Sequence, residues 1–339
     1  MKNLLTALSL ILAFTASAQT TDSAQYFYNR GLEFKEAKLY SKAAKSLEKA
    51  IAIDPKFTAA YLQNGYINAA MYKNSAAIAN FSKVRELEPG NMMAIKELME
   101  LYYNYRQFAK ALELAQLCKD CANAQKITAL IYYQQEDYAK AEKALLAVLA
   151  KNSNDAEVAY ALGRTYMEME QQKGTIEYYE KAVALDTTKA IWMNELGVIY
   201  FAAGNFRKAV VYFNKAAAAG FQQSNGFNEN LGFAYLYSGE YDKGEKLLLT
   251  VLERKPGNKE LIRDIADAYY DSKNYDKALD YCQKLLEADD KDAKALYQAG
   301  LCFVKKGQKD KGQAMCDKAI EMDPSLSNMR RQQNIAPGL

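Results

Sequence analysis

Residues 24–57, AQYFYNRGLEFKEAKLYSKAAKSLEKAIAIDPKF, carry apolar residues at helical spacing in two runs that separate near Lys38 and Leu39. This pattern predicts two short amphipathic helices packed face to face. Small residues such as Ala43 fall where the two helix axes come closest, at about 8–10 Å. Pro55 then prevents the second helix from continuing. One such pair cannot bury its own apolar surface, so it needs neighbours.

The same pattern returns along the chain at nearly constant spacing. With Ala24 counted as position 1, position 8 is glycine in six units, position 11 is aromatic in eight and position 20 is small in all nine. We therefore expect an all-α chain of nine helix pairs in tandem, of which the third is shorter than the others. The units are 24–57, 58–91, 92–121, 122–155, 156–189, 190–224, 225–258, 259–292 and 293–326.

The period and the marks L-G-x-x-Y, A-x-x-x-[FLY] and P closely resemble the tetratricopeptide repeat (TPR) family. The resemblance covers residues 24–326, although the family's tryptophan at position 4 is missing and the lone Trp192 sits one place earlier. It implies a right-handed α-solenoid in which the first helix of each pair lines a concave face. Contacts between neighbouring repeats hold such a solenoid together.

The two ends of the chain differ from the repeats. Residues 1–18 resemble a secretory signal peptide, with a basic start, an apolar core at 4–14 and a small-residue cleavage site at 16–18. A membrane anchor is the rival interpretation, but a bilayer span needs roughly 20 apolar residues. We expect export of a bacterial type to the periplasm or the exterior, a short linker at 19–23 and no membrane insertion of the mature chain. Residues 327–339 form either a polar cap or a disordered tail.

The composition of the chain argues against nucleic-acid binding, metal or cofactor sites and most enzymatic reactions. The 44 basic and 41 acidic residues nearly balance, which gives no electrostatic case for a nucleic-acid partner. Histidine is absent from the sequence, so Ser–His and Cys–His nucleophile pairs and histidine zinc sites are excluded. No glycine-rich phosphate-binding motif occurs. We therefore expect no metal, no cofactor and no enzymatic activity. A carboxylate site that acts on a cell-envelope polymer is the weakest alternative.

The five cysteines leave several interpretations open. Cys118 and Cys121 end the shortened third unit, where they are either two unremarkable thiols, a local disulfide, or a redox or metal pair. Cys282, Cys302 and Cys316 fall at helical positions that look buried, where cysteine acts as a small hydrophobe. Pairing of Cys282 with Cys302 is conceivable.

The TPR resemblance assigns positions 2, 5, 9, 12 and 13 of each first helix to the concave face. Many of these residues are aromatic, and aromatic residues and arginine are the usual anchors of protein interfaces. The alternative is that the curvature of the solenoid packs these side chains against the next unit. Units six and seven carry the largest apolar stretch. The candidate partner-binding residues are Tyr28, Leu62, Tyr66, Tyr103, Tyr133, Tyr160, Arg164, Asn194, Val198, Phe201, Phe233, Tyr237, Arg263, Tyr270 and Tyr297.

These observations predict an exported, non-enzymatic scaffold that binds another protein or an extended peptide through an aromatic-rich concave groove. The family's two-carboxylate clamp is not reproduced, because an acidic residue follows the basic one at Lys96–Glu100 and at Arg263–Asp267. The alternative function is a self-associating structural subunit of a cell-envelope assembly, which would be a homo-oligomer.

Overall fold

The chain is all-α in the residues that the structure, a computed structural model, describes: 22–118 and 121–327. These residues form 18 α-helices paired into nine helix-turn-helix repeats, which confirms the predicted fold class. Residues 22 and 23, expected in a linker, already belong to the first helix, which covers residues 22–36. The expected signal peptide and residues 328–339 of the tail lie outside the described residues.

The chain divides into two compact units, 1–175 and 176–339. The first helix at 22–36 is followed in the first unit by α2 (Tyr40–Ile53), α3 (Thr58–Ala70), α4 (Asn74–Leu87), α5 (Met92–Asn104), α6 (Phe108–Leu117), α7 (Ala122–Gln134), α8 (Tyr138–Lys151) and α9 (Ala156–Glu168). The boundary falls within α10 (Gln172–Leu185).

The second unit contains the remaining helices. They are α11 (Ala190–Ala202), α12 (Phe206–Ala218), α13 (Asn225–Ser238), α14 (Tyr241–Arg254), α15 (Lys259–Asp271), α16 (Tyr275–Ala288), α17 (Ala293–Lys305) and α18 (Lys309–Met322). A short 3-10 helix, η1 (Pro324–Leu326), follows α18 and buries Leu326.

Position 8 is glycine because the two helices of a pair meet there. A methyl group added to Gly65 would lie 2.5 Å from the Phe81 ring, and one added to Gly197 would lie 2.7 Å from the Phe213 ring. Both phenylalanines occupy position 24 of their repeats and are completely buried. The glycine therefore makes room for a large core side chain from the partner helix.

Every repeat turns between its two helices through one residue with positive φ at position 15. Glycine takes this place in three repeats, for example Gly239 with φ of +92°. In the other six it is Lys38, Tyr72, Arg106, Glu136, Glu170 or Lys273, with φ between 56° and 63°. This left-handed conformation is unfavourable for residues with a Cβ atom, so the packed helices on either side must impose it.

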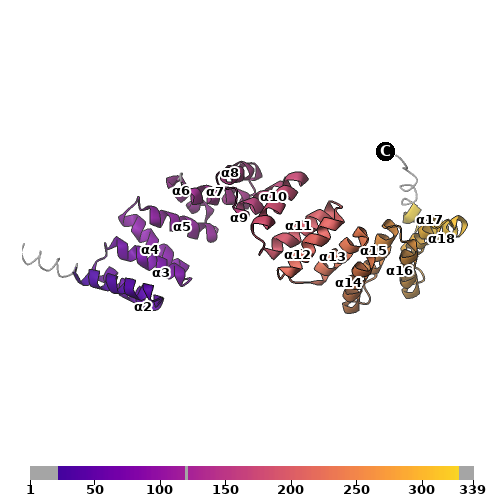
Figure 1. Ribbon diagram of the computed structural model, residues 1–339, viewed down its shortest axis with the longest axis horizontal. Helices are drawn as coiled ribbons and strands as arrows, with labels where there is room; N and C mark the ends of the chain where they lie inside the picture. The colour runs from indigo at the N-terminus through magenta and orange to yellow at the C-terminus, as the bar shows by residue number, and fades with distance from the viewer. Residues whose placement is uncertain (1–21, 119–120, 328–339) are drawn as a thin grey trace, which may run out of the picture. The chain divides into compact units, whose positions relative to one another are not determined.

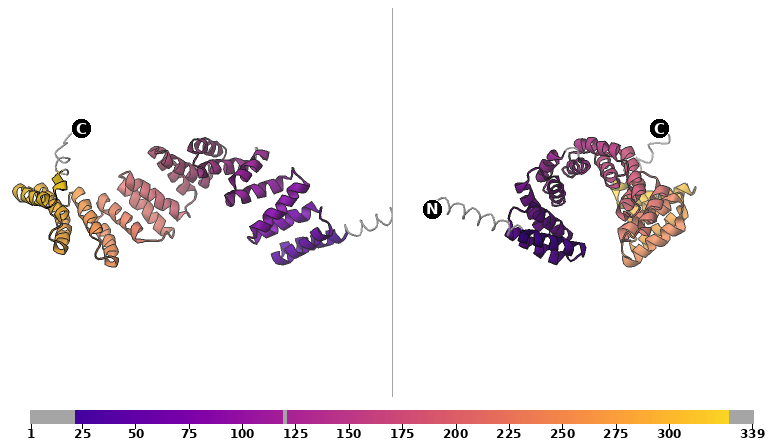
Figure 2. Two further views of the ribbon diagram at one scale, coloured as in Figure 1. Left: turned by 180° about the vertical axis from the view of Figure 1, so that it is seen from behind. Right: turned by 60° about the vertical axis from the view of Figure 1, so that its left-hand side comes forward.

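Helices in substantial contact are first or second neighbours along the chain. Within each unit, the first helix of one repeat contacts the first helix of the next, as between α5 and α7 or α13 and α15. Figure 1 shows the helix pairs of each unit stacked one after another, and Figure 2 shows the same stacking from two other sides. We call the side formed by successive first helices the first-helix face.

Candidate binding surface

The helix α11 is largely apolar, and Asn194 and Glu195 are its polar residues. Met193, Leu196 and Tyr200 face inward and are buried, as the repeat pattern requires. Ile191 and Val198 lie seven residues apart, on one side of the helix, and are 61% and 41% exposed. Asn194 and Glu195, three and four residues after Ile191, share this side and are partly buried. The exposed Ile191 and Val198 nevertheless mark a surface that a partner could cover.

Phe201, Phe206 and Tyr237 form what we call the aromatic cluster, which continues this surface. The Phe206 and Tyr237 rings stack with centroids 4.7 Å apart, and the Phe201 ring meets them edge-on at 5.3 Å and 6.3 Å. All three side chains are only partly buried. A hollow lined by residues 203–207, Tyr237 and Ser238 adjoins the cluster. The structure thus brings the predicted residues Phe201 and Tyr237 together across two repeats.

Phe206, at position 17 of its repeat, was not among the predicted site residues. Phe201, at position 12 of its repeat, packs on Phe206, and the other aromatic residues at position 12 make a comparable contact. Each packs on an aromatic at position 17 of its own repeat, and the pairs are Tyr103–Phe108, Tyr133–Tyr138 and Tyr270–Tyr275, with centroids 6.2, 6.5 and 5.5 Å apart. Turn packing therefore accounts for part of their burial, and the Phe201 ring in addition meets the Tyr237 ring of the next repeat.

Asp264, Asp267 and Asp271 form an acidic row along α15, since residues three and four apart share one side of a helix. Burial, together with the other two carboxylates, raises the pKa of Asp267 to about 6, and Arg263 only partly opposes this rise. Burial, followed by the charges of Asp271, Asp267 and Asp264, raises the pKa of Tyr237 to about 12. The acidic row therefore lies beside the aromatic cluster and favours a positively charged partner group.

The raised pKa of Asp267 predicts a pH-dependent stability. Because the folded chain binds this proton more tightly than the unfolded chain, stability falls as the pH rises from about 4 through about 6. We expect Asp267→Asn to remove most of this fall and to stabilise the chain at pH 7 by about 1 kcal/mol, a value reduced for partial solvent exposure. Urea unfolding at pH 4.5 and 7 measures the effect. Asp290→Asn, at an exposed loop position, is the control, and an unchanged pH slope in Asp267→Asn would contradict the prediction.

The predicted basic residue Arg263 has a structural contact. Its Nη2 atom lies 2.7 Å from the carboxylate of Asp292, which also caps α17 by accepting a hydrogen bond from the Ala295 amide. Lys126, at the same repeat position, pairs in the same way with Asp155 at 2.9 Å, and Asp155 caps α9. These basic residues join one repeat to the helix start of the next.

Leu62 and Tyr297 are not accessible. Leu62 is 7% exposed and belongs to the core that surrounds Phe81, while Tyr297 is 3% exposed and packs in a cluster with Leu326. The structure therefore places these two predicted residues in the core of their repeats. Repeat position fixes the side of the helix, but neighbouring elements decide how far that side is covered.

The remaining predicted residues are partly buried. Tyr28 packs on the Phe57 ring at 4.9 Å, and Tyr66 meets the Phe81 ring edge-on at 5.3 Å. The Tyr160 hydroxyl accepts a hydrogen bond of 3.2 Å from Arg164. Asn194 lies on α11 and Phe233 on α13, where Phe233 packs against the core of repeats seven and eight.

Cys118 and Cys121 are joined by a disulfide, with Cα atoms 5.4 Å apart, at the end of the ten-residue α6. This separation lies within the range that a disulfide requires. Cys282, Cys302 and Cys316 are buried free thiols. Burial is the main cause that raises the pKa of both Cys282 and Cys302 to about 12, and the charge of Asp267 adds to the rise in each case. Neither thiol is therefore readily ionised.

Within residues 22–118 and 121–327, no cluster of three or more cysteine, aspartate or glutamate side chains is arranged to hold a metal ion. In the same part of the chain, every helix is too short or too polar to cross a bilayer.

Paired helices in tandem, with an apolar and aromatic first-helix face, define an α-helical repeat scaffold. The chain belongs to the tetratricopeptide repeat family, whose models match residues 24–57, 104–157, 128–188, 160–224, 235–300 and 293–326. Scaffolds of this family serve protein binding.

Curated relatives share parts of the chain. The chain is 28% identical over 162 residues to the human protein O-mannosyl-transferase TMTC1, which covers 47% of this chain and 18% of that protein. It is 24% identical over 192 residues to the DnaJ protein P58IPK homolog of Arabidopsis thaliana, covering 52% and 40%. The chain thus spans less than half the length of each of these relatives.

Solved structures resemble the chain in fold. PilW, a type IV pilus biogenesis factor, is 20% identical with a TM-score of 0.49, and the match covers 61% of this chain and 96% of PilW. The TPR domain of P58(IPK) is 15% identical with a TM-score of 0.32, and the match covers 93% and 99%.

Proposed function

We propose that this chain is a non-enzymatic scaffold that binds a segment of another protein on the first-helix face of repeats six to eight. The observation that carries the proposal is the pair of exposed apolar residues Ile191 and Val198 on α11, together with the partly buried aromatic cluster. Desolvated aromatic residues are the strongest anchors in protein interfaces, where one residue can contribute about 2 kcal/mol or more.

The partner segment combines an apolar or aromatic anchor with basic side chains. The anchor covers the aromatic cluster and the exposed side of α11. The basic side chains meet the acidic row on α15. Arg263 lies near this row and partly opposes the raised pKa values of Asp264 and Asp267, but its ion pair is with Asp292. Backbone edges for strand addition do not occur in an all-α array, so side-chain contacts supply the affinity.

Selection of peptides from a random display library on the whole chain tests this proposal. We expect the selected peptides to be enriched in aromatic and basic residues. Phe201→Ala combined with Tyr237→Ala should weaken their binding 10-fold or more, with little change in thermal unfolding. Tyr103→Ala, at position 12 of repeat three, is the matched control and should leave binding intact. Equal binding by the double variant would refute the assignment of this face.

Self-association is the second candidate function, because the exposed apolar side of α11 would also suit another copy of the chain. Sedimentation across a range of concentrations separates the two, since a strict monomer at high concentration removes this candidate. We also propose export through residues 1–18 to the periplasm or the exterior, and intact-mass measurement of the exported chain tests for cleavage after Ala18.

A further inference from the structure

Repeats six and eight share a tyrosine pair on the side away from the first-helix face. In repeat six, Tyr200 at position 11 and Tyr212 at position 23 stack with centroids 5.6 Å apart and ring planes at 13°. In repeat eight, Tyr269 and Tyr281 occupy the same positions and stack at 5.8 Å and 23°. The second tyrosine of each pair thus lies in the groove between successive second helices, against the ring of the first.

A glutamate from the preceding repeat contacts the second tyrosine in each case, from position 25 in repeat five and from position 21 in repeat seven. The Tyr281 hydroxyl donates a hydrogen bond of 2.8 Å to Glu245 on α14, and Tyr212 reaches Glu180 on α10 at 3.5 Å. A lysine at position 19 completes the arrangement: Lys208 lies 4.7 Å from the centroid of the Tyr200 ring. The arrangement is therefore built from a lysine, two tyrosines and a polar group of the repeat before.

Repeat four keeps this arrangement but lacks the second tyrosine. Tyr132 occupies position 11, and Lys140 at position 19 lies 5.6 Å from the centroid of its ring. Position 23 is Ala144, and in the preceding repeat Gln116 takes the position of Glu180 while Leu112 takes that of Glu245. Ala115 is also small, at position 24, where Phe81 and Phe213 stand in other repeats.

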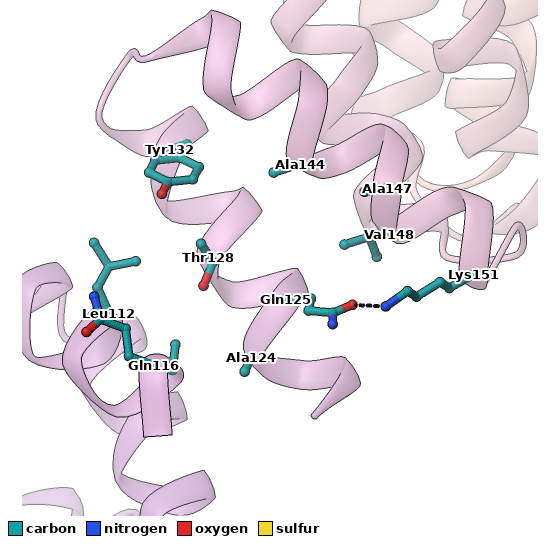
Figure 3. A pocket seen from close by; sticks show the side chains of 11 residues that line it. Leu112, Gln116, Ala124, Gln125, Thr128, Tyr132, Ala144, Ala147, Val148 and Lys151 are labelled. Atoms are coloured by element: carbon teal, nitrogen blue, oxygen red, sulfur yellow. Dashed lines mark hydrogen bonds between the residues drawn. The ribbon is translucent and has the colours of Figure 1, made fainter. Parts of the chain in front are cut away.

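A hollow of about 440 Å³ lies between α6 and α8, with α7 as its floor (Figure 3). Leu112 and Gln116 line it from α6, Tyr132 and Thr128 from α7, and Ala144 and Val148 from α8. A hydrogen bond of 2.8 Å from Lys151 to Gln125 lies at one end. Repeat six has a hollow of the same volume, about 440 Å³, but it is lined by Tyr212 and not by Tyr200, so Tyr212 lies where the hollow of repeat four reaches Tyr132.

We propose that the hollow of repeat four binds a tyrosine side chain presented by another polypeptide. The ring stacks on Tyr132, as Tyr212 stacks on Tyr200, and its hydroxyl bonds Gln116 in place of the glutamate. A hollow of this volume exceeds the ~150 Å³ that suffices for a benzene ring, which leaves room for the backbone that carries the tyrosine. This site is separate from the first-helix face, so either can fail without the other.

Methyl NMR of the full chain, labelled at alanine, tests the proposal with N-acetyl-tyrosinamide as the probe. We expect saturable shifts of the Ala144 and Ala147 methyl groups and binding at least fivefold tighter than that of N-acetyl-leucinamide. Phenylalanine amide should bind more weakly than tyrosine amide, and Gln116→Ala should remove that difference. p-Cresol should also bind more weakly, and binding as tight as that of the amide would overturn the assignment to a polypeptide.

Ala144→Tyr supplies the decisive variant, since it places a tyrosine at the same position as Tyr212 and Tyr281. We expect it to raise the melting temperature and to abolish the shift of the Ala147 methyl group. Ala144→Ser leaves the hollow open, and its affinity should stay within twofold of the parent. Unchanged probe binding by Ala144→Tyr, or no saturable binding by the parent chain, would overturn the proposal.

Discussion

Gly244→Ala should destabilise repeat seven by about 3 kcal/mol, the upper part of the range for overpacking in a closely packed interior. A methyl group at this position would lie 2.7 Å from the Gly232 carbonyl oxygen and 2.8 Å from the Leu236 side chain. A backbone oxygen cannot move aside as a flexible side chain can, so α13 and α14 must separate. Urea unfolding measures the loss, and amide hydrogen exchange should localise it to these two helices.

Gly226→Ala is the matched control in the same repeat. Gly226 also lies in α13, but a methyl group added there would have no neighbour within 4 Å. Because alanine is the better helix former, this variant should be neutral or more stable by up to about 1 kcal/mol. Equal destabilisation by the two substitutions would show that the glycine at position 20 is not needed for close helix approach.

Tyr281→Ala should cost about 3–4 kcal/mol, because it empties a fully packed site at the contact of repeats seven and eight. Tyr281 is 1% exposed, stacks on Tyr269 and donates a hydrogen bond to Glu245. Tyr281→Phe keeps the ring and loses only the hydrogen bond, which should cost about 1–2 kcal/mol. Thermal and urea unfolding of both variants check the difference.

Tyr72→Ala is the control for tyrosine removal in general, since Tyr72 is 90% exposed and its loss should change stability by no more than about 0.5 kcal/mol. A cost for Tyr281→Ala no larger than that of this control would mean that the second tyrosine of the pair contributes little. The proposed use of the empty position in repeat four would then also lose its physical basis.

The fold could be predicted because each repeat carries its own complete set of marks. Gly65 and Phe81, or Gly232 and Leu248, stand at fixed spacing and meet in the structure as the pattern requires. The turn residue at position 15 could not be predicted. Glu136 and Lys273 give no sequence signal for a left-handed conformation, which the helices on either side impose.

The candidate surface was predictable only in part. Phe201 and Tyr237 follow from repeat position, but Phe206 contributes through a stacking contact between two repeats that spacing along the chain does not show. Arg263 looked available for a partner, because the sequence does not reveal that the loop before the next helix brings Asp292 within 2.7 Å. Side chains that act within one repeat are thus easier to assign than those whose surroundings come from two.

In the described part of the chain, substantial helix contacts join first and second neighbours along the sequence, which has a consequence for synthesis. Native contacts need no long loop to close, so the entropy barrier to forming them is low. As the growing chain leaves the ribosome at about 5–20 residues per second, each helix pair can pack on the pair already made. Emerging apolar residues such as Met193 and Leu196 of α11 are then exposed only until their packing partners have been made.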